Sequence, residues 1–281
     1  MVNFAASTSI RAITLMHCPA CLSRKTRKLK TKTVLSYHQF YCRECRTQFN
    51  ERTGTPLNFI EYPTEIVMLV VYHYYRFKLS LDDVVELMAI RGVHLSHQTV
   101  HNWAQTFGTD LGIKLRSVRR RTAGSKWHID ATYIKVDGHW CYLYRAIDKE
   151  GNLVDVRLSD TRDQAAAEAF FNQCHETTDV TPEQITTDKE PALYPALENT
   201  LSLTKHRDVK YKNNNIEQDH RGIKSRYEVM KGFCGIFTAI IFCTTFEEIR
   251  QLFRMENKTR AERRKIIPSK FQEFKQVFVT N

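Results

Sequence analysis

The period of apolar and polar residues along the chain changes at Trp127. Before it, apolar side chains recur at helical spacing, and after it Ile129, Ala131 and Tyr133 alternate with polar neighbours, as in a half-buried strand. The segments that follow are strands over 139–148 and 153–158, a helix over 162–175, a strand over 184–187 and a helix over 192–201. This βββαβα order, with a final helical region, predicts an α/β fold with a mixed sheet.

The region before this sheet predicts three helices. Residues 64–77 form an apolar helical stretch, Ser80 is a typical N-cap for a second helix, and Ser96 is the N-cap of a third. The short turn between the last two helices indicates a helix-turn-helix. The outward residues expected to meet base edges are His97, Gln98, His101, Asn102 and Gln105. Those expected to meet phosphates are Arg116, Arg119, Arg120 and Arg121. Three packed helices that bind no DNA are the alternative.

Positive charge is concentrated in the front of the 281-residue chain, whose net charge is +11. Residues 1–124 contain 18 Lys and Arg against 8 Asp and Glu, whereas residues 125–281 contain 24 against 23. Because neutralised phosphates release counterions, the front predicts a polyanion-binding module. A solvated basic surface is the alternative. No apolar run approaches the ~18 residues of a membrane-spanning helix, so we expect an intracellular protein.

Four of the eight cysteines form two C-x2-C knuckles. Cys18 and Cys21 make the first, Cys42 and Cys45 make the second, and 20 residues separate them. Four thiolates close a tetrahedron around one ion, so we expect a zinc ribbon with one structural zinc. Unligated buried cysteines and a redox pair are the alternatives. The residues between the knuckles that we expect on a cationic strand against DNA phosphates are Lys28, Lys30 and Lys32.

Three acidic residues come from three different kinds of local sequence. Asp130 lies within the first strand of the predicted sheet, Asp188 follows the strand over 184–187, and Glu217 opens a polar helical stretch. The element order matches the RNase H-like layout, in which the first strand is central and the fourth lies beside it. The carboxylates should therefore converge, and such a group is tolerated when divalent cations lie between its members. These three residues are the candidate catalytic residues and the candidate ligands of magnesium or manganese.

Five motifs in a fixed order lead to a family resemblance. They are Trp127-His128-Ile129-Asp130, Tyr133-Ile134-Lys135-Val136, the stretch 142–148, Thr186-Thr187-Asp188-Lys189 and the stretch 217–221. With them the chain resembles DDE transposases, most closely the bacterial and archaeal insertion-sequence-six family, including its members with an N-terminal zinc ribbon. The resemblance implies an RNase H-like catalytic domain, two magnesium ions, action on terminal inverted repeats, and strand transfer that joins donor DNA to target DNA.

Cationic residues near the acids are assigned to DNA. Arg221 and Lys224 lie four and seven residues after Glu217 on one helix face, where we expect them to hold phosphates of the scissile strand. Lys189 is a further candidate contact. The chain departs from the family pattern at Ala131, where an acid is usual, and in a short spacer of 28 residues between the last two acids. A catalytically inactive, transposase-derived DNA-binding protein or repressor is therefore the alternative function, and a nuclease or retroviral-type integrase is a third.

The expected organisation has three domains. They are a zinc ribbon over 1–58, a helix-turn-helix domain over 59–124, and an RNase H-like catalytic domain with C-terminal helices over 125–281. The expected partners are the terminal inverted repeats of the element and target DNA. Cutting two DNA ends in one reaction favours a homodimer or higher homo-oligomer. We expect the protein in the cytoplasm, at the nucleoid, without membrane attachment.

Overall fold

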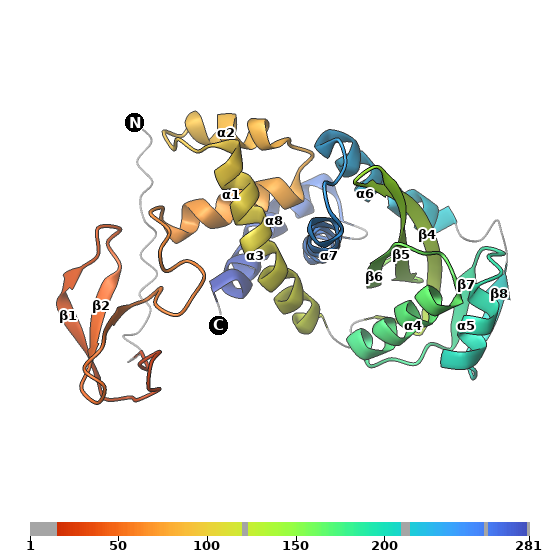
Figure 1. Ribbon diagram of the computed structural model, residues 1–281, viewed down its shortest axis with the longest axis horizontal. Helices are drawn as coiled ribbons and strands as arrows, with labels where there is room; N and C mark the ends of the chain where they lie inside the picture. Colours follow the sequence, from red (N-terminus) through yellow and green to blue (C-terminus); the bar gives the residue numbers. More distant parts are fainter. Residues whose placement is uncertain (1–15, 120–122, 209–213, 256–257, 280–281) are drawn as a thin grey trace.

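The computed structural model describes residues 16–119, 123–208, 214–255 and 258–279. Three parts follow one another along the molecule (Figure 1): a small three-stranded sheet, a group of helices, and a five-stranded sheet flanked by helices. The mixed α/β architecture confirms the predicted fold class. Over these described ranges, no helix has the length and apolar character needed to cross a membrane.

The large sheet has the strand order β6-β5-β4-β7-β8. Three antiparallel neighbours come first: β4 (Lys126–Val136), β5 (His139–Asp148) and β6 (Leu153–Ser159). Asp137 and Gly138 both have positive φ, as a two-residue type I′ turn between the first two strands requires. After a helical crossover, β7 (Gln184–Thr187) pairs parallel with β4 and makes it central. This is the strand order of an RNase H-like fold.

One strand was not predicted from the sequence. β8 (Lys205–Asp208) pairs parallel with β7 and forms an edge of the sheet. Its four residues are polar and partly or fully exposed, so no alternation of apolar and polar residues marks it. The strand exists because β7 offers it backbone hydrogen bonds, and that pairing is invisible in a local pattern.

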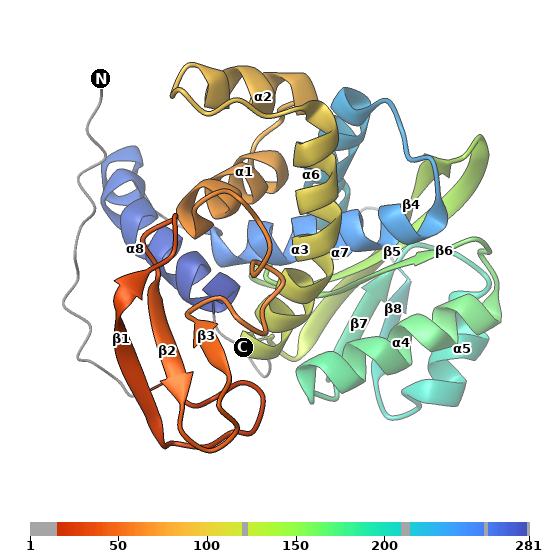
Figure 2. The same cartoon turned by 60° about the vertical axis from the view of Figure 1, so that its left-hand side comes forward.

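Helices cover both faces of the large sheet (Figure 2). α4 (Gln164–Thr178) and α5 (Leu193–Thr200) pack on one face, in a core that includes Trp127 and Ile129. α6 (Asn214–Met230) and α7 (Ile236–Leu252) lie on the other face, where Ile134 and Leu143 belong to the core. Because side chains alternate along a strand, Asp130 belongs to the face that α6 and α7 cover.

The helical part contains the three predicted helices, α1 (Thr64–Arg76), α2 (Leu81–Ala89) and α3 (His97–Val118). Ser80 and Asp83 form a capping box at α2, and Ser96 accepts a bond from the Thr99 amide at α3. The predicted inner face of α3, made of Val100, Trp103 and Phe107, is buried. α8 (Arg260–Val279) joins the same core, which continues onto the α7 face of the large sheet. The helices and the sheet are therefore packed together.

The small sheet lies at the front of the described chain. β1 (Thr26–Lys32), β2 (His38–Cys42) and β3 (Gln48–Asn50) are antiparallel, in that order. Its contact with α1 is made by Tyr37, whose hydroxyl donates to Thr64 Oγ1 at 2.9 Å and accepts from the Thr64 amide at 2.8 Å. These two hydrogen bonds attach this part to the start of α1.

Candidate active site

Asp130 lies within the central strand β4, and Asp188 directly follows the neighbouring strand β7. β4 and β7 run parallel, with Trp127 opposite Ile185 and His128 opposite Thr186. Continuing this register by two residues places Asp188 beside Asp130, and neighbouring strands are about 4.8 Å apart. The structure thus brings together the backbones of two of the three candidate acids.

The third acid, Glu217, lies on α6, and its side chain is outside the described residues. The helix itself lies against β4, since His220 Nδ1 is 3.7 Å from Asp130 Oδ2. His220 is buried, and this burial lowers the pKa of its imidazole to about 3, so the ring is neutral. Glu217 precedes it by less than one helical turn. The start of α6 is therefore close to Asp130.

The surroundings of Asp188 leave its carboxylate accessible. Its side chain is 37% exposed, and its ion pair with Arg162 is long, at 3.6 Å. Arg162 is closer to Glu190, at 2.8 Å. Lys189, the predicted DNA contact between these two acids, is exposed. An accessible, loosely paired carboxylate is chemically suited to receive a cation from solution.

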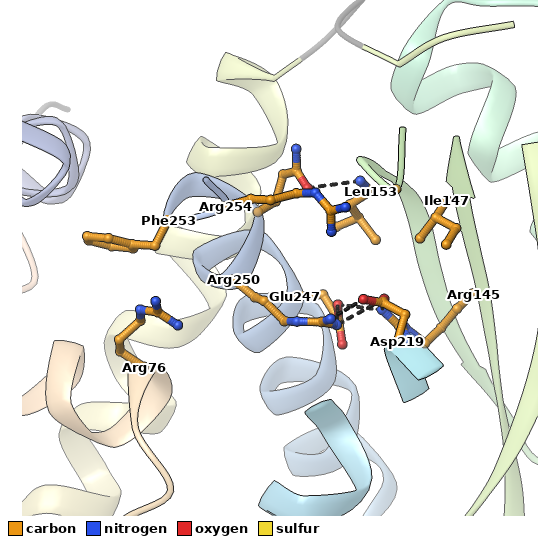
Figure 3. Close-up of a pocket in the computed structure, with 11 residues that line it drawn as sticks. Arg76, Arg145, Ile147, Leu153, Asp219, Glu247, Arg250, Phe253 and Arg254 are labelled. Carbon is orange, nitrogen blue, oxygen red and sulfur yellow. Dashed lines mark hydrogen bonds and ion pairs between the residues drawn. The ribbon is translucent and has the colours of Figure 1, made fainter. Parts of the chain in front are cut away.

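A buried ionic cluster, drawn in Figure 3, connects α6 and α7 to β5. Arg145, directly opposite Asp130 in the β4–β5 pair, is fully buried. Its Nη2 donates to Asp219 of α6 and, at 2.8 Å, to Glu247 of α7. Arg250 of α7 donates to both of these carboxylates. Burial opposes ionisation of Asp219, but the two guanidinium groups hold its pKa below the usual value.

Sequence reasoning missed this cluster. Arg145, Glu247 and Arg250 received no assignment, although an arginine between the apolar residues of a strand was a usable signal of a buried ion pair. Its partners could not be inferred, because they lie 74 and 102 positions away. A cavity of about 190 Å³ adjoins the cluster and is also lined by Arg76 and Arg254.

The expected phosphate contact at Arg119 is wrong. Its side chain is 8% exposed and makes a two-pronged ion pair with Glu248, at 2.6 and 2.7 Å, besides donating to the carbonyls of Leu153 and Val154. Arg116 likewise pairs with Asp155 at 2.7 Å. These arginines tie α3 to β6 and α7, because a buried guanidinium needs carboxylates and carbonyls around it. Arg120 and Arg121 lie outside the described residues.

The other predicted DNA contacts lie on the surface. His97, Gln98 and Asn102 are exposed on α3, His101 and Gln105 are half-buried, and the Gln98 amide donates to Asn102 at 2.7 Å. On the small sheet, an exposed row is formed by Lys28, Lys30 and Lys32. On α6, the exposed cations are Arg221 and Lys224. These side chains are accessible to a polyanion.

The four knuckle cysteines converge at one end of the small sheet. Cys18 Sγ is 3.5 Å from Cys45 Sγ, Cys21 Sγ is 3.6 Å from Cys42 Sγ, and all four sulfurs lie within 4.8 Å of one another. A tetrahedron with zinc–sulfur bonds of about 2.3 Å has edges of about 3.8 Å, so the cluster can hold a metal ion of this size. Hydrogen bonding with Thr47 lowers the pKa of the Cys45 thiol to about 6, which favours a thiolate.

Known proteins resemble this chain in the part that contains the large sheet. Residues 124–256 match a transposase family model described as a DDE domain. The transposase for the insertion sequence-like element IS431mec of Staphylococcus aureus is 37% identical over 171 residues, which cover 59% of this chain and 75% of the relative. The transposase for insertion sequence element IS257 in transposon Tn4003 of Staphylococcus aureus matches with the same identity and coverage.

A solved structure, the HTLV-2 integrase catalytic core domain in complex with magnesium, aligns with a TM-score of 0.38 and 19% identity, over 50% of this chain and 95% of that chain. The strand order β6-β5-β4-β7-β8 identifies the fold. An RNase H-like sheet with acids at the carboxyl end of its paired parallel strands is the architecture of a polynucleotidyl transferase. Within that class, the chain belongs to the DDE transposases of the insertion-sequence-six family, together with those of IS431 and IS257.

Proposed function

We propose that the protein binds the terminal inverted repeats of an insertion sequence, cleaves DNA at its ends, and joins those ends to target DNA. Family membership supports the reaction. The observation that supports the site is the register of β4 and β7: continued by two residues, it pairs Asp130 with Asp188, and His220 of α6 lies against Asp130.

The carboxylates fit a divalent metal. Carboxylate oxygens are preferred ligands of magnesium and manganese, and Asp188 is accessible to solvent. We therefore assign Asp130, Asp188 and Glu217 as ligands of two magnesium (or manganese) ions. Metal bound there would activate the attacking hydroxyl or water and stabilise the leaving oxygen. His220 stays neutral beside Asp130, so it adds no positive charge that would compete with a cation.

The exposed cations would position the DNA. Arg221 and Lys224 follow Glu217 on α6 and are assigned to phosphates of the scissile strand, with Lys189 beside Asp188 as a further contact. The row of lysines on β1 and the outward face of α3 are assigned to the terminal repeat. We propose the zinc ribbon, the helix-turn-helix and the catalytic part as the three functional units, over 1–58, 59–124 and 125–281. For coordinated cutting of two ends we propose a homodimer or higher homo-oligomer.

Removing the charge of Asp188 tests the proposed metal site. Asp188→Asn keeps the size of the side chain but removes a metal ligand, so nicking of supercoiled donor DNA in magnesium should fall by at least about a thousandfold. The matched control is Asp160→Asn, an exposed acid that directly follows β6, which should leave nicking unchanged. The donor plasmid carries the inverted repeats that flank the gene.

Nicking assays and calorimetry of the wild-type protein distinguish the alternative function from the proposed one. A wild-type chain that binds the repeats, shows no manganese binding by calorimetry and nicks nothing would be the DNA-binding protein or repressor that Ala131 and the short spacer allow. Nicking that survives Asp188→Asn would contradict the assignment of the site.

A further inference from the structure

Exposed aromatic side chains gather on the β4–β5 hairpin, outside the acidic site. Tyr133 is 52% exposed and Trp140 is 61% exposed. Their ring centroids are 6.2 Å apart in an edge-on arrangement, and the ring of Tyr142 is 5.3 Å from that of Tyr133. Large aromatic rings are usually buried, so a cluster of this kind on the surface indicates a binding surface. We call Tyr133, Trp140 and Tyr142 the aromatic patch.

Two cations border the aromatic patch. Lys135 Nζ lies 5.8 Å from the ring centre of Trp140, and the guanidinium of Arg162 lies 5.7 Å from the ring centre of Tyr133. Aromatic faces beside positive charges are the combination that binds unpaired nucleotides, since bases stack on the rings while phosphates meet the cations. A protein partner with an apolar surface would gain nothing from these two charges.

The aromatic patch lies on the face of β4 opposite Asp130, and Arg162 links it to Asp188, which follows the end of β7. Arg162 Nη1 donates to the Tyr133 hydroxyl at 2.9 Å, and Nη2 of the same guanidinium is 3.6 Å from Asp188 Oδ2. One side chain thus touches both the patch and a proposed metal ligand. If metal bound at Asp188 holds the scissile phosphate, the neighbouring nucleotide would be within reach of the rings.

We propose that the aromatic patch stacks an unpaired nucleobase of the DNA strand next to the scissile phosphate. This inference rests on the proposed function. The patch would stabilise a locally opened DNA end, so that the strand enters the acidic site without its complement. Trp140, with the largest exposed ring, would make the main contact.

Fluorescence tests the contact without any catalysis. The chain has three tryptophans, of which Trp103 and Trp127 are buried, so DNA contact with the exposed surface is reported by Trp140. We expect a short single-stranded oligodeoxynucleotide to quench tryptophan emission of the full chain saturably, and a blunt duplex of the same sequence to quench it less. Trp140→Phe should abolish the quenching while anisotropy still reports DNA binding. Undiminished quenching in this variant, or no quenching of wild-type protein that binds the strand, would overturn the proposal.

Cleavage kinetics test whether the aromatic patch stabilises an opened DNA end. Trp140→Ala should slow nicking of a fully paired end about tenfold, which corresponds to about 1.4 kcal/mol, and an end with mismatched terminal pairs should recover most of that rate. Phe237→Ala, which removes another exposed ring, on α7, is the matched control and should change neither substrate. Equal losses on both substrates, or a smaller oligomer by sedimentation, would show that the patch serves folding or self-association and would sink the inference. Wild-type protein inactive on both ends would count against the proposed function alone, because the quenching experiment stands without cleavage.

Discussion

Arg145 illustrates how one residue can determine the chemistry of its neighbours. A guanidinium inside a sheet loses its hydration, and this cost is offset only when carboxylates surround it. Asp219 and Glu247 supply them, and Arg250 balances their charge. The acid at position 219 is therefore explained as a structural partner of Arg145, although it lies two residues from the proposed ligand Glu217.

Removing the carboxylate of Asp219 should lower the free energy of unfolding. In Asp219→Asn, Arg145 stays buried but loses one of its two carboxylate partners. We therefore expect about 3–5 kcal/mol of destabilisation and a melting temperature lower by roughly 10 °C. Calorimetry without divalent metal measures this. Glu228→Gln, an exposed acid on the same helix, is the control and should melt like wild type. A melting temperature unchanged in Asp219→Asn would mean that the cluster contributes nothing.

The difference in stability between wild type and Asp219→Asn should depend on pH. The pKa of Asp219 is lower in the folded state than its ordinary value of 3.8, so its contribution is present above that value and is lost as the pH falls through the folded pKa. The stability gap between wild type and Asp219→Asn should therefore be constant near neutral pH and narrow below about pH 4.

At this scale the sequence reveals residue types but not their partners. Asp130 and Asp188 could be identified because a strand interior and a strand end are visible in the local pattern. Arg119 could not be assigned correctly, because Glu248, which buries it, lies 129 positions away. A surface arginine and a buried one have the same local sequence, and long-range pairing decides between them.

Among the elements, α3 depends on close contact with its neighbours at Gly108. The Tyr75 hydroxyl of α1 donates to the Ala104 carbonyl at 2.9 Å, and Thr245 of α7 donates to the Gly108 carbonyl at 2.7 Å. A Cβ at Gly108 would collide with the Tyr75 hydroxyl and lie 3.0 Å from Ile241. The absence of a side chain lets three helices meet at one point.

Gly108→Ala tests this crossing. Alanine favours a helix over glycine by about 1 kcal/mol, while overpacking costs about 1–3 kcal/mol and the displaced Tyr75 bond about 1 kcal/mol more. We expect net destabilisation and a melting temperature lower by about 2–8 °C, measured by thermal unfolding. Ser117→Ala, at an exposed position of α3, is the control and should not lower it. A stabilised Gly108→Ala protein would show that the helices have room to move apart.

Elements could be predicted where their cause is local. The cap of α2 depends on Ser80 and Asp83, three residues apart, and the first hairpin of the large sheet depends on Asp137 and Gly138. β8 could not be predicted, because its cause is the exposed edge of β7 and not its own polar residues. The contact of α6 with Asp130 likewise depends on a buried cluster drawn from three elements.

For the whole molecule, the main contrast is between a large shared core and a front sheet with almost none. The helices and the α7 face of the large sheet share one apolar core. Among the described residues, the apolar core of the small sheet consists of Cys18, Phe40, Cys42 and Phe49, with Met16 against them. A core of this size cannot offset the entropy lost on folding, so the front sheet needs another source of stability. The cysteine cluster is placed to supply it.

We therefore expect one zinc ion per chain, whose loss unfolds the small sheet and leaves the rest folded. Structural zinc contributes about 10–16 kcal/mol to such sites, far more than four buried side chains can. Cys42→Ser should lose the metal, expose residues 16–50 to protease and weaken binding to the terminal repeat, because the lysine row on β1 depends on this sheet. Metal analysis and limited proteolysis measure the first two effects.

The control is Cys234→Ser, which changes an exposed cysteine outside the cluster and should keep both the zinc and the protection from protease. Zinc retained in Cys42→Ser, or none in wild-type protein, would contradict a structural metal here, since no other part of the described front sheet can replace its contribution.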